Sequence, residues 1–547
     1  MTWIWNNSPA LPVVLLLPTA IAIPLFALIE RRLARWLALA VSLTTVGLSI
    51  LNLVKALSLG PIHYHMGGWP PPIGIEYVLD PLSAFVLLVI NTIGFLVLVH
   101  AKKVVDREIP ESGKHVPYYA VAVLMLCGFN GIVVTGDFFN LYVWLEIASL
   151  SLYGLIAVGS RKAPVAAIRY LILGTIGACF YLLGLGFLFT MTGTLNMADL
   201  KAILPAVGHE PAVVIGLGLI VAGMGLKMAL FPLHGWLPDS YTYAPSSSSA
   251  LIAPIGTKVG AYVLIRVLFF IFGTAYVSRT IPVTTVIGWL AAAGILYGSI
   301  MAMAQTELKR MLAYSSIAQV GYIGLGIGLA NPLGLIGAVL HLMNHAAMKA
   351  LLFLVAGNFR TILGHSDIAR LDGSTRRRMP WTTAAFAVGA LSMIGIPPLA
   401  GFFSKWYLAL GAVAKKQWIF LAVILLSSLL NAVYFFRVIE RIYFARAEST
   451  PQLPGMTAGA CSGLTLSPLS PIPSKGAEYK SVASRPRLER RGLALANGSS
   501  AAEPRTEASA SMLVPVLVLA AALIGLGVLN AFIVKGVIGK IVTSAMF

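Results

Sequence analysis

Long apolar runs separated by short polar stretches recur along almost the whole chain. Lipid requires a segment to satisfy its own backbone hydrogen bonds, and an α-helix needs about 20 apolar residues to cross the hydrocarbon layer. The pattern therefore predicts an all-α polytopic membrane protein with about 14 transmembrane helices, two of them broken. The expected spans are residues 10–29, 36–57, 79–101, 116–135, 138–158, 164–192, 212–240 (broken), 247–273, 282–303, 309–330, 333–358, 382–412 (broken), 417–437 and 512–534.

The basic residues between these spans are concentrated in alternate loops. One set of loops holds Arg31, Arg32, Arg35, Lys102, Lys103, Arg107, Arg161, Lys162, Lys309, Arg310, Arg360, Arg370, Arg376, Arg377 and Arg378. The other set holds only Lys201, Arg279, Lys415 and Lys416. Because cytoplasmic loops carry the excess of lysine and arginine, we expect the first set in the cytoplasm and both termini outside. The predicted location is the cell inner (plasma) membrane.

The composition argues against a soluble domain, a nucleic-acid-binding protein and a protein with a metal or cluster site. Of the 547 residues, 58% are hydrophobic and 11% are charged, whereas soluble domains are about a quarter charged. The formal net charge of +19 lies in short loops rather than on a basic face with interleaved aromatic residues, so no nucleic-acid partner is expected. The three cysteines include no CxxC pair, which argues against an iron–sulfur cluster, a zinc site or a disulfide framework. No cofactor and no metal are expected.

Glu146 and Lys227 are ionisable residues at membrane depth, in the predicted fifth and seventh spans. Each needs a reason, because a charge at the centre of a span costs roughly 2.5–3.5 kcal/mol. Burial disfavours the charged amine, and a nearby carboxylate favours it again, so a lysine balanced between them can load and release a proton. We expect the two residues to pair and exchange protons; the alternative is a static ion pair that holds two helices together.

Further polar groups lie in the predicted eighth and eleventh spans. Lys258 is surrounded by small residues in ALIAPIGTKVGAYVLIR, which suits either a wet interior route or a structural pair. His341, His345 and Lys349 recur at i, i+4 and i+8 and so share one helix face. Two histidines four residues apart can also bind zinc, but no HExxH glutamate accompanies them. A proton relay is the preferred interpretation.

Prolines interrupt the predicted seventh and twelfth spans. Pro232 removes a backbone donor and clashes with the preceding turn, so the seventh helix should break there. His234, beside that break, is either a relay group or a histidine satisfied by a backbone carbonyl. Pro397 and Pro398 should break the twelfth helix, and Lys405 follows them.

The two breaks suggest an internal symmetry. Helices four to eight and nine to thirteen form two groups of five, and the fourth helix of each group is interrupted and carries a lysine. Because five is odd, the groups would start from opposite sides of the membrane as inverted repeats, with sites at their broken helices. The expected divisions are an N-terminal three-helix segment (1–115), a first repeat (116–273), a second repeat (282–445), a disordered cytoplasmic insertion rich in Ser, Pro, Ala, Gly and Arg (446–511) and a C-terminal helix (512–547).

Several stretches resemble one known family. They are GDFFNLYVWLEI, KMALFPLHGWLPDSY, TKVGAYVLIR, ELKRMLAYSSIAQVGY, HLMNHAAMKALLFL and GIPPLAGFFSKW. The chain is similar to the proton-translocating antiporter-like family, which includes subunits of Mrp-type Na⁺/H⁺ antiporters, of respiratory complex I and of membrane-bound hydrogenases. GDFFNLYVWLEI and GTLNMADL look most like the D-type subunit of Mrp antiporters.

The resemblance implies a fold of fourteen helices with two inverted five-helix repeats. It also implies roles by position: Glu146 as the charged partner in the fifth helix, Lys227 as the lysine of the broken seventh, Lys258 as the lysine joining two half-channels, Lys405 as the terminal lysine, and His341, His345 and Lys349 on a polar eleventh helix.

The expected function is that of a proton-translocating membrane subunit of a multisubunit Na⁺/H⁺ antiporter. Its partners would be other membrane subunits of a hetero-oligomeric complex, protons, Na⁺ and the lipid bilayer. The alternative is an antiporter-like proton-pumping subunit of NADH:quinone oxidoreductase (complex I) or of a membrane-bound hydrogenase. A static scaffold, in which the buried charges only hold helices together, is a third possibility.

Overall fold

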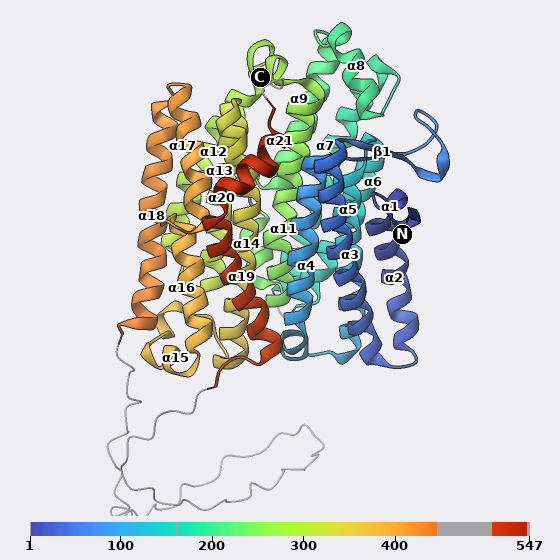
Figure 1. The fold of residues 1–547 in the computed structure, drawn as a ribbon. Helices are drawn as coiled ribbons and strands as arrows, with labels where there is room; N and C mark the ends of the chain where they lie inside the picture. Colours follow the sequence, from blue (N-terminus) through green and yellow to red (C-terminus); the bar gives the residue numbers. More distant parts are fainter. Residues whose placement is uncertain (1, 160–161, 446–505, 544–547) are drawn as a thin grey trace, which may run out of the picture.

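Long helices run side by side through the whole molecule (Figure 1). The computed structural model describes residues 2–159, 162–445 and 506–543 of the chain. The first half contains α1 (Thr2–Asn7), α2 (Leu11–Ala27), α3 (Arg31–Leu59), β1 (Ile62–His65), η1 (Met66–Gly68), β2 (Glu76–Leu79), α4 (Pro81–Glu108), η2 (Ser112–Lys114), α5 (His115–Val134), α6 (Phe138–Ala157), α7 (Ala163–Thr192), α8 (Met197–Val207), α9 (Pro211–Met228), α10 (Leu237–Tyr243), α11 (Ser246–Ile265), η3 (Arg266–Phe272) and η4 (Tyr276–Thr280).

The second half continues the same arrangement. It contains α12 (Val283–Met303), α13 (Leu308–Leu329), α14 (Pro332–Leu363), η5 (Ile368–Arg370), α15 (Gly373–Arg378), α16 (Pro380–Ile394), α17 (Ala400–Ala414), α18 (Trp418–Tyr443), α19 (Ala510–Val528), α20 (Asn530–Ile533), η6 (Val534–Ile538) and α21 (Gly539–Ile541).

The predicted spans are confirmed as helices. Twelve helical segments of the described residues are long and apolar enough to cross a membrane. The other two expected spans correspond to the shorter apolar helix α2 and to α16 with its continuation α17.

Several helices begin at capping residues that the sequence provides. The Asp80 side chain accepts from Ser83 N ahead of Pro81, and Asn331 Oδ1 accepts from Gly334 N (2.7 Å) ahead of Pro332.

Both predicted breaks are present. Helix α9 ends at Met228, and Ala229 then adopts a left-handed conformation with φ of 62° before α10 starts at Leu237. Helix α16 ends at Ile394, and Gly395 adopts φ of 94° before α17 starts at Ala400. A left-handed residue directly after the last turn is a common way for a helix to end. At each break a side chain from beyond the helix donates to a carbonyl of its last turns: Trp236 Nε1 to Leu226 O (3.0 Å) and Lys405 Nζ to Ile394 O (3.0 Å).

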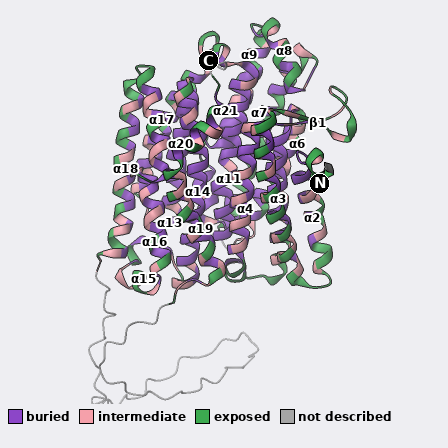
Figure 2. Cartoon of the chain, in the orientation of Figure 1, coloured by how far each residue is buried: buried purple, intermediate pink, exposed green. Residues whose placement is uncertain are grey.

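The central helices are almost entirely buried, whereas the outer helices are largely exposed. In the most apolar stretch of α13 and of α14, 94% of the residues are buried, against 39% in α7 and in α18. Figure 2 shows the same contrast between a buried centre and exposed outer helices. The exposed side chains of α18 include Ile419, Leu425, Leu429 and Val433, as expected for a surface that faces lipid.

Charged helix ends meet on one face of the bundle. Arg360, near the end of α14, lies 3.9 Å from Glu108 at the end of α4. Asp239 of α10 pairs with Arg169 of α7 (2.8 Å) and lies 3.6 Å from Arg310 of α13. These contacts place helix ends from the basic set of loops together, as alternating spans require.

The opposite face carries a short hairpin that was not predicted. Strands β1 and β2 pair antiparallel, with His65 opposite Glu76. The Glu76 side chain accepts from Asn196 Nδ2 (3.0 Å), and its carbonyl accepts from Gly136 N (2.8 Å). The hairpin thus ties the α3–α4 connection to the turns before α6 and before α8.

The predicted insertion at 446–511 is longer than the structure allows. Residues 446–505 lie outside the described residues, but the final part of the predicted stretch is built into the bundle. Glu507 accepts from the backbone N–H of Trp381 (2.8 Å) and from the Thr382 hydroxyl (2.6 Å) at the start of α16. A carboxylate there satisfies free N–H groups and favours the helix dipole, which composition alone cannot reveal. Helix α19 starts at Ala510.

Candidate functional site

Lys227 lies in the last turn of α9, immediately before the break. Its side chain is buried, and Nζ donates to the Ser149 hydroxyl of α6 at 2.8 Å. Glu146, one turn earlier on α6, is close enough to act electrostatically on the lysine. The buried Glu146 Oε1 has no hydrogen-bond partner. The predicted residues are therefore brought together, but the lysine bonds Ser149 rather than forming a direct ion pair with Glu146 in the described structure.

Close helix packing holds Lys227 in place. Gly260 of α11 lies against the backbone of Lys227 and Met228, and a Cβ at position 260 would come within 2.9 Å of Met228 N. No larger residue fits there without a shift of one helix. Lys258 lies on the same helix, two positions earlier, so α11 links the first broken helix to the centre of the bundle.

His234 lies in the break after α9. Its ring stacks on Phe231, with centroids 5.3 Å apart, and lies 4.8 Å from the ring of Tyr297 on α12. The side chain is buried, and its Nδ1 has no hydrogen-bond partner. The His234 imidazole therefore lies between the break and α12, with one ring nitrogen that has no hydrogen-bond partner.

His341 and His345 form a stacked pair on α14. Their ring centroids are 5.7 Å apart with an interplanar angle of 17°, and both residues are fully buried. His341 Nδ1 lies 2.9 Å from the Ser404 hydroxyl of α17. His341 Nε2 and both ring nitrogens of His345 have no partner among the described residues. Buried polar atoms are normally hydrogen-bonded, so three such nitrogens together mark a place for water or for an exchanging proton.

Two lysines lie beside this pair. Lys258 Nζ donates to the Ala253 carbonyl (2.7 Å) and to the Thr257 hydroxyl (3.3 Å), and both Lys258 and Lys349 act electrostatically on His345. Lys349 Nζ donates to the Leu312 carbonyl of α13 (2.7 Å) and to the Ser315 hydroxyl. Lys349 therefore points from the shared face of α14 toward α13.

Lys405 lies on α17, after the second break. Its Nζ donates to the carbonyl oxygens of Met393 and Ile394, both at 3.0 Å, and to the Ser428 hydroxyl at 3.2 Å. It also lies 5.1 Å above the ring of Tyr322. A cation at the C-terminal end of a helix is favoured by the helix dipole and by the free carbonyl groups. Lys405 therefore caps α16 across the break.

These groups form a connected series. His341 lies within electrostatic range of Lys405 and of Lys258, and His345 lies within range of His341, Lys258 and Lys349. The series thus runs from Lys258 on α11 through the two histidines on α14 to Lys405 on α17. The Glu146–Lys227 cluster lies next to this series through the packing of α11 against α9 and α6.

Sequence reasoning missed several polar members of the site. Gln319 of α13 is fully buried, and neither its Oε1 nor its Nε2 has a partner. Tyr322, one turn later, lies between His341 and Lys405 through its ring contacts. Both lie in the stretch ELKRMLAYSSIAQVGY, and an uncharged polar residue inside an apolar span is the signal that could have found Gln319.

The arrangement suits proton transfer rather than redox or metal chemistry in its own residues. Lysine and histidine both bind and release protons, and stacked imidazoles with free nitrogens can pass a proton through a short chain of water. Within the described ranges, no group of three or more His, Cys, Asp and Glu side chains could hold a metal ion.

Comparison with known proteins identifies the family of the chain. The family described as "NADH:quinone oxidoreductase/Mrp antiporter, TM" matches residues 135–431, more than half of the chain. The chain is 45% identical to NADH-quinone oxidoreductase subunit N of Desulforudis audaxviator, over 97% of this chain and 98% of the relative. It is 31% identical to the D subunit of the Na(+)/H(+) antiporter of Bacillus subtilis, over 83% of this chain and 90% of the relative.

A solved structure shares the fold over nearly the full length of the alignment. A chain of the membrane-bound sulfane sulfur reductase, an archaeal respiratory membrane complex, superposes with a TM-score of 0.81 at 28% identity, covering 98% of both chains. The matched region includes both broken helices and the buried lysines and histidines described above. On these grounds the chain belongs to the NADH:quinone oxidoreductase/Mrp antiporter transmembrane family.

Proposed function

We propose that this chain is a proton-translocating membrane subunit of a multisubunit Na⁺/H⁺ antiporter. The observation that carries the proposal is the series Lys258, His345, His341 and Lys405, in which buried basic groups follow one another and His345 has two unpartnered ring nitrogens. Isolated buried charges are costly in a membrane, so a connected series is best explained by function.

The Glu146–Lys227 cluster would supply protons to the series that starts at Lys258. Lys227 bonds Ser149 in the structure, with the free Glu146 Oε1 nearby. A swing of the lysine from the hydroxyl to the carboxylate would strengthen its charged form, since two opposite charges 4 Å apart attract by about 4 kcal/mol at an effective dielectric of 20. Return to Ser149 would release the proton toward α11. His234, in the break, would serve as a relay group on the same route.

The same proposal includes the symmetry and the orientation of the chain. Helices α5–α11 and α12–α18 would form two inverted repeats, each with one broken span, corresponding to residues 116–273 and 282–445. Support comes from the matching helix ends at Ala229 and Gly395. Both termini would lie outside the cell, with the basic loops in the cytoplasm.

A second candidate is an antiporter-like proton-pumping subunit of NADH:quinone oxidoreductase. The relative that favours it is the subunit N protein with 45% identity. Both candidates use the same proton route and differ in the companion subunits. Purification of the native complex and identification of its other proteins separates them: further antiporter subunits support the first candidate, and flavin- and cluster-binding subunits support the second.

The proton route itself is tested at the histidine pair. The double variant His341→Phe/His345→Phe keeps two aromatic rings but removes every ring nitrogen, so we expect loss of Na⁺-dependent proton exchange in membrane vesicles. The exposed His209→Phe serves as the control, because it removes an imidazole outside the bundle. A double variant that assembles and exchanges protons at the normal rate would contradict the proposal and would indicate that the two histidines only hold helices together.

A further inference from the structure

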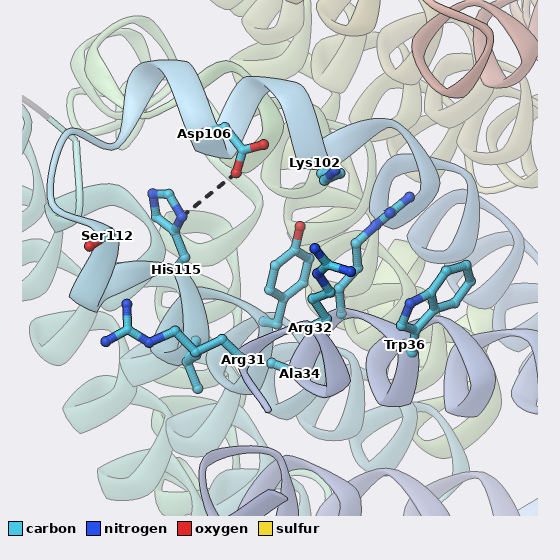
Figure 3. Close-up of a pocket in the computed structure, with 11 residues that line it drawn as sticks. Arg31, Arg32, Ala34, Trp36, Lys102, Asp106, Ser112 and His115 are labelled. Carbon is cyan, nitrogen blue, oxygen red and sulfur yellow. Dashed lines mark ion pairs between the residues drawn. The ribbon is translucent and has the colours of Figure 1, made fainter. Parts of the chain in front are cut away.

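A basic pocket opens on the face of the bundle that carries the Arg310–Asp239 pair. It has a volume of about 520 Å³ and lies between the start of α3, the end of α4 and the start of α5. Figure 3 shows Arg31, Arg32, Lys102 and His115 around this hollow. Nothing in the proposed proton transfer uses these side chains.

The charge of the pocket is unbalanced. Its lining includes the four cationic residues Arg31, Arg32, Arg35 and Lys102 but a single carboxylate, Asp106, which lies 3.7 Å from His115. Arg32 has only a distant, exposed contact of 3.7 Å with Glu30. The other three cationic residues form no ion pair within the described part of the chain. The pocket therefore lacks about three negative charges, which an anionic ligand would supply.

The guanidinium group of Arg35 has an unused hydrogen-bond donor in the pocket. Arg35 is half-buried, lies 5.4 Å from the ring of Trp36, and its Nε is buried without a hydrogen-bond partner. A guanidinium group binds phosphate oxygens through two parallel hydrogen bonds. A phosphate in the pocket would satisfy Arg35 Nε.

An apolar stripe leads away from the pocket along α3. Trp36, Leu43 and Ile50 are 60%, 55% and 51% exposed, and their spacing of seven residues places them on one face of the helix. Tryptophan at this position is typical of the membrane–water interface. A ligand that fills the pocket can therefore also lie along a surface suited to acyl chains, which a soluble phosphate cannot use.

We propose that this pocket binds the phosphate headgroup of an anionic phospholipid whose acyl chains lie along the Trp36–Leu43–Ile50 stripe. The charge selects an anionic headgroup, and the stripe selects a lipid over a free anion. Basic pockets between membrane helices at this depth are suited to such headgroups. The bound lipid would hold the α2–α3 and α4–α5 connections together.

Native mass spectrometry of the full-length chain in detergent tests the proposal, with phosphatidylglycerol and phosphatidylcholine of identical acyl chains as probes. We expect one saturable phosphatidylglycerol site and at least tenfold weaker binding of phosphatidylcholine. The double variant Arg31→Gln/Arg35→Gln should weaken phosphatidylglycerol binding roughly thirtyfold, as two cationic groups near a membrane surface imply. Arg31→Lys/Arg35→Lys should retain most of it.

A matched control removes two arginines from the same face but outside the pocket. Arg377→Gln/Arg441→Gln, both exposed, should bind phosphatidylglycerol as the unmodified chain does. If the pocket double variant fails to fold, Lys102→Gln alone should still weaken binding several-fold. Equal binding by the pocket variants and the control would overturn the proposal, and so would displacement of the lipid by millimolar inorganic phosphate, which would show a site for a free anion.

Discussion

The two broken helices hold their lysines in opposite ways. Lys227 precedes its break and reaches across to Ser149, with Glu146 nearby. Lys405 follows its break and reaches back to the carbonyl oxygens of Met393 and Ile394. One lysine therefore has a single neutral bond and an acidic neighbour that can tune its charge, whereas the other is fixed by the end of a helix. Similar helix breaks can therefore suit two different roles, one at the entry of the proposed proton route and one at its end.

Removal of either lysine should have the largest effect. Lys227→Met and Lys405→Met should each reduce Na⁺-dependent proton exchange by about 100-fold or more, since a positioned proton-transfer group contributes on that order. Exchange is measured in inverted membrane vesicles as the sodium-driven collapse of a proton gradient. The exposed Lys201→Met is the control and should remain active. Near-normal exchange by assembled Lys227→Met would contradict the account.

Stability should separate the two lysine variants. Lys405→Met leaves the Ile394 carbonyl without its side-chain donor, and an unsatisfied buried acceptor costs about 1–3 kcal/mol. Lys227→Met removes a buried amine that makes one side-chain bond, so little is lost. We therefore expect Lys405→Met to unfold at a lower temperature in detergent than Lys227→Met. The reverse order would show that capping of α16 is not the role of Lys405.

Replacement of the acidic neighbour should have an intermediate effect. Glu146→Gln keeps the shape of the side chain but removes the charge that acts on Lys227, so we expect roughly tenfold slower exchange, since the lysine keeps its amine and its bond to Ser149. The rate is measured in the same vesicles. A rate as low as that of Lys227→Met would indicate an obligatory ion pair instead of a tuning charge.

The two serines offer the finest comparison. Ser149→Ala removes the side-chain partner of Lys227, and a several-fold fall in exchange is expected for one hydrogen bond of about 1 kcal/mol. Ser428→Ala leaves Lys405 with two carbonyl partners, so exchange should change little. Initial rates measured side by side would show the difference. Equal falls would mean that the two lysines are held alike.

The sequence was sufficient for the helices and for the two breaks. Apolar length and proline position predict the spans and the breaks at Pro232 and at Pro397–Pro398 because lipid imposes a strict requirement on backbone hydrogen bonding. The partners of the buried lysines could not be predicted in the same way. Ser149 and the carbonyl of Ile394 become partners only when helices pack, and no periodic pattern distinguishes one buried serine or carbonyl from another.

Two other features escaped prediction for similar reasons. The β1–β2 hairpin is stabilised by contacts of Glu76 with distant turns, and the cap of α16 by Glu507 joins segments that are far apart in the chain. Gln319 was visible as a polar residue in an apolar span but carried no charge to mark it. Hydrogen bonds between polar groups far apart in the chain are therefore the part of the fold that the sequence could not predict.

The most direct test of the proton route is a high-resolution cryo-electron microscopy map of the native complex that shows ordered water. The account predicts water within about 3 Å of the free nitrogens of His345 and of His341 Nε2, joining Lys258 to Lys405 in one chain. A dry cavity around these nitrogens, with no water between the two lysines, would contradict it.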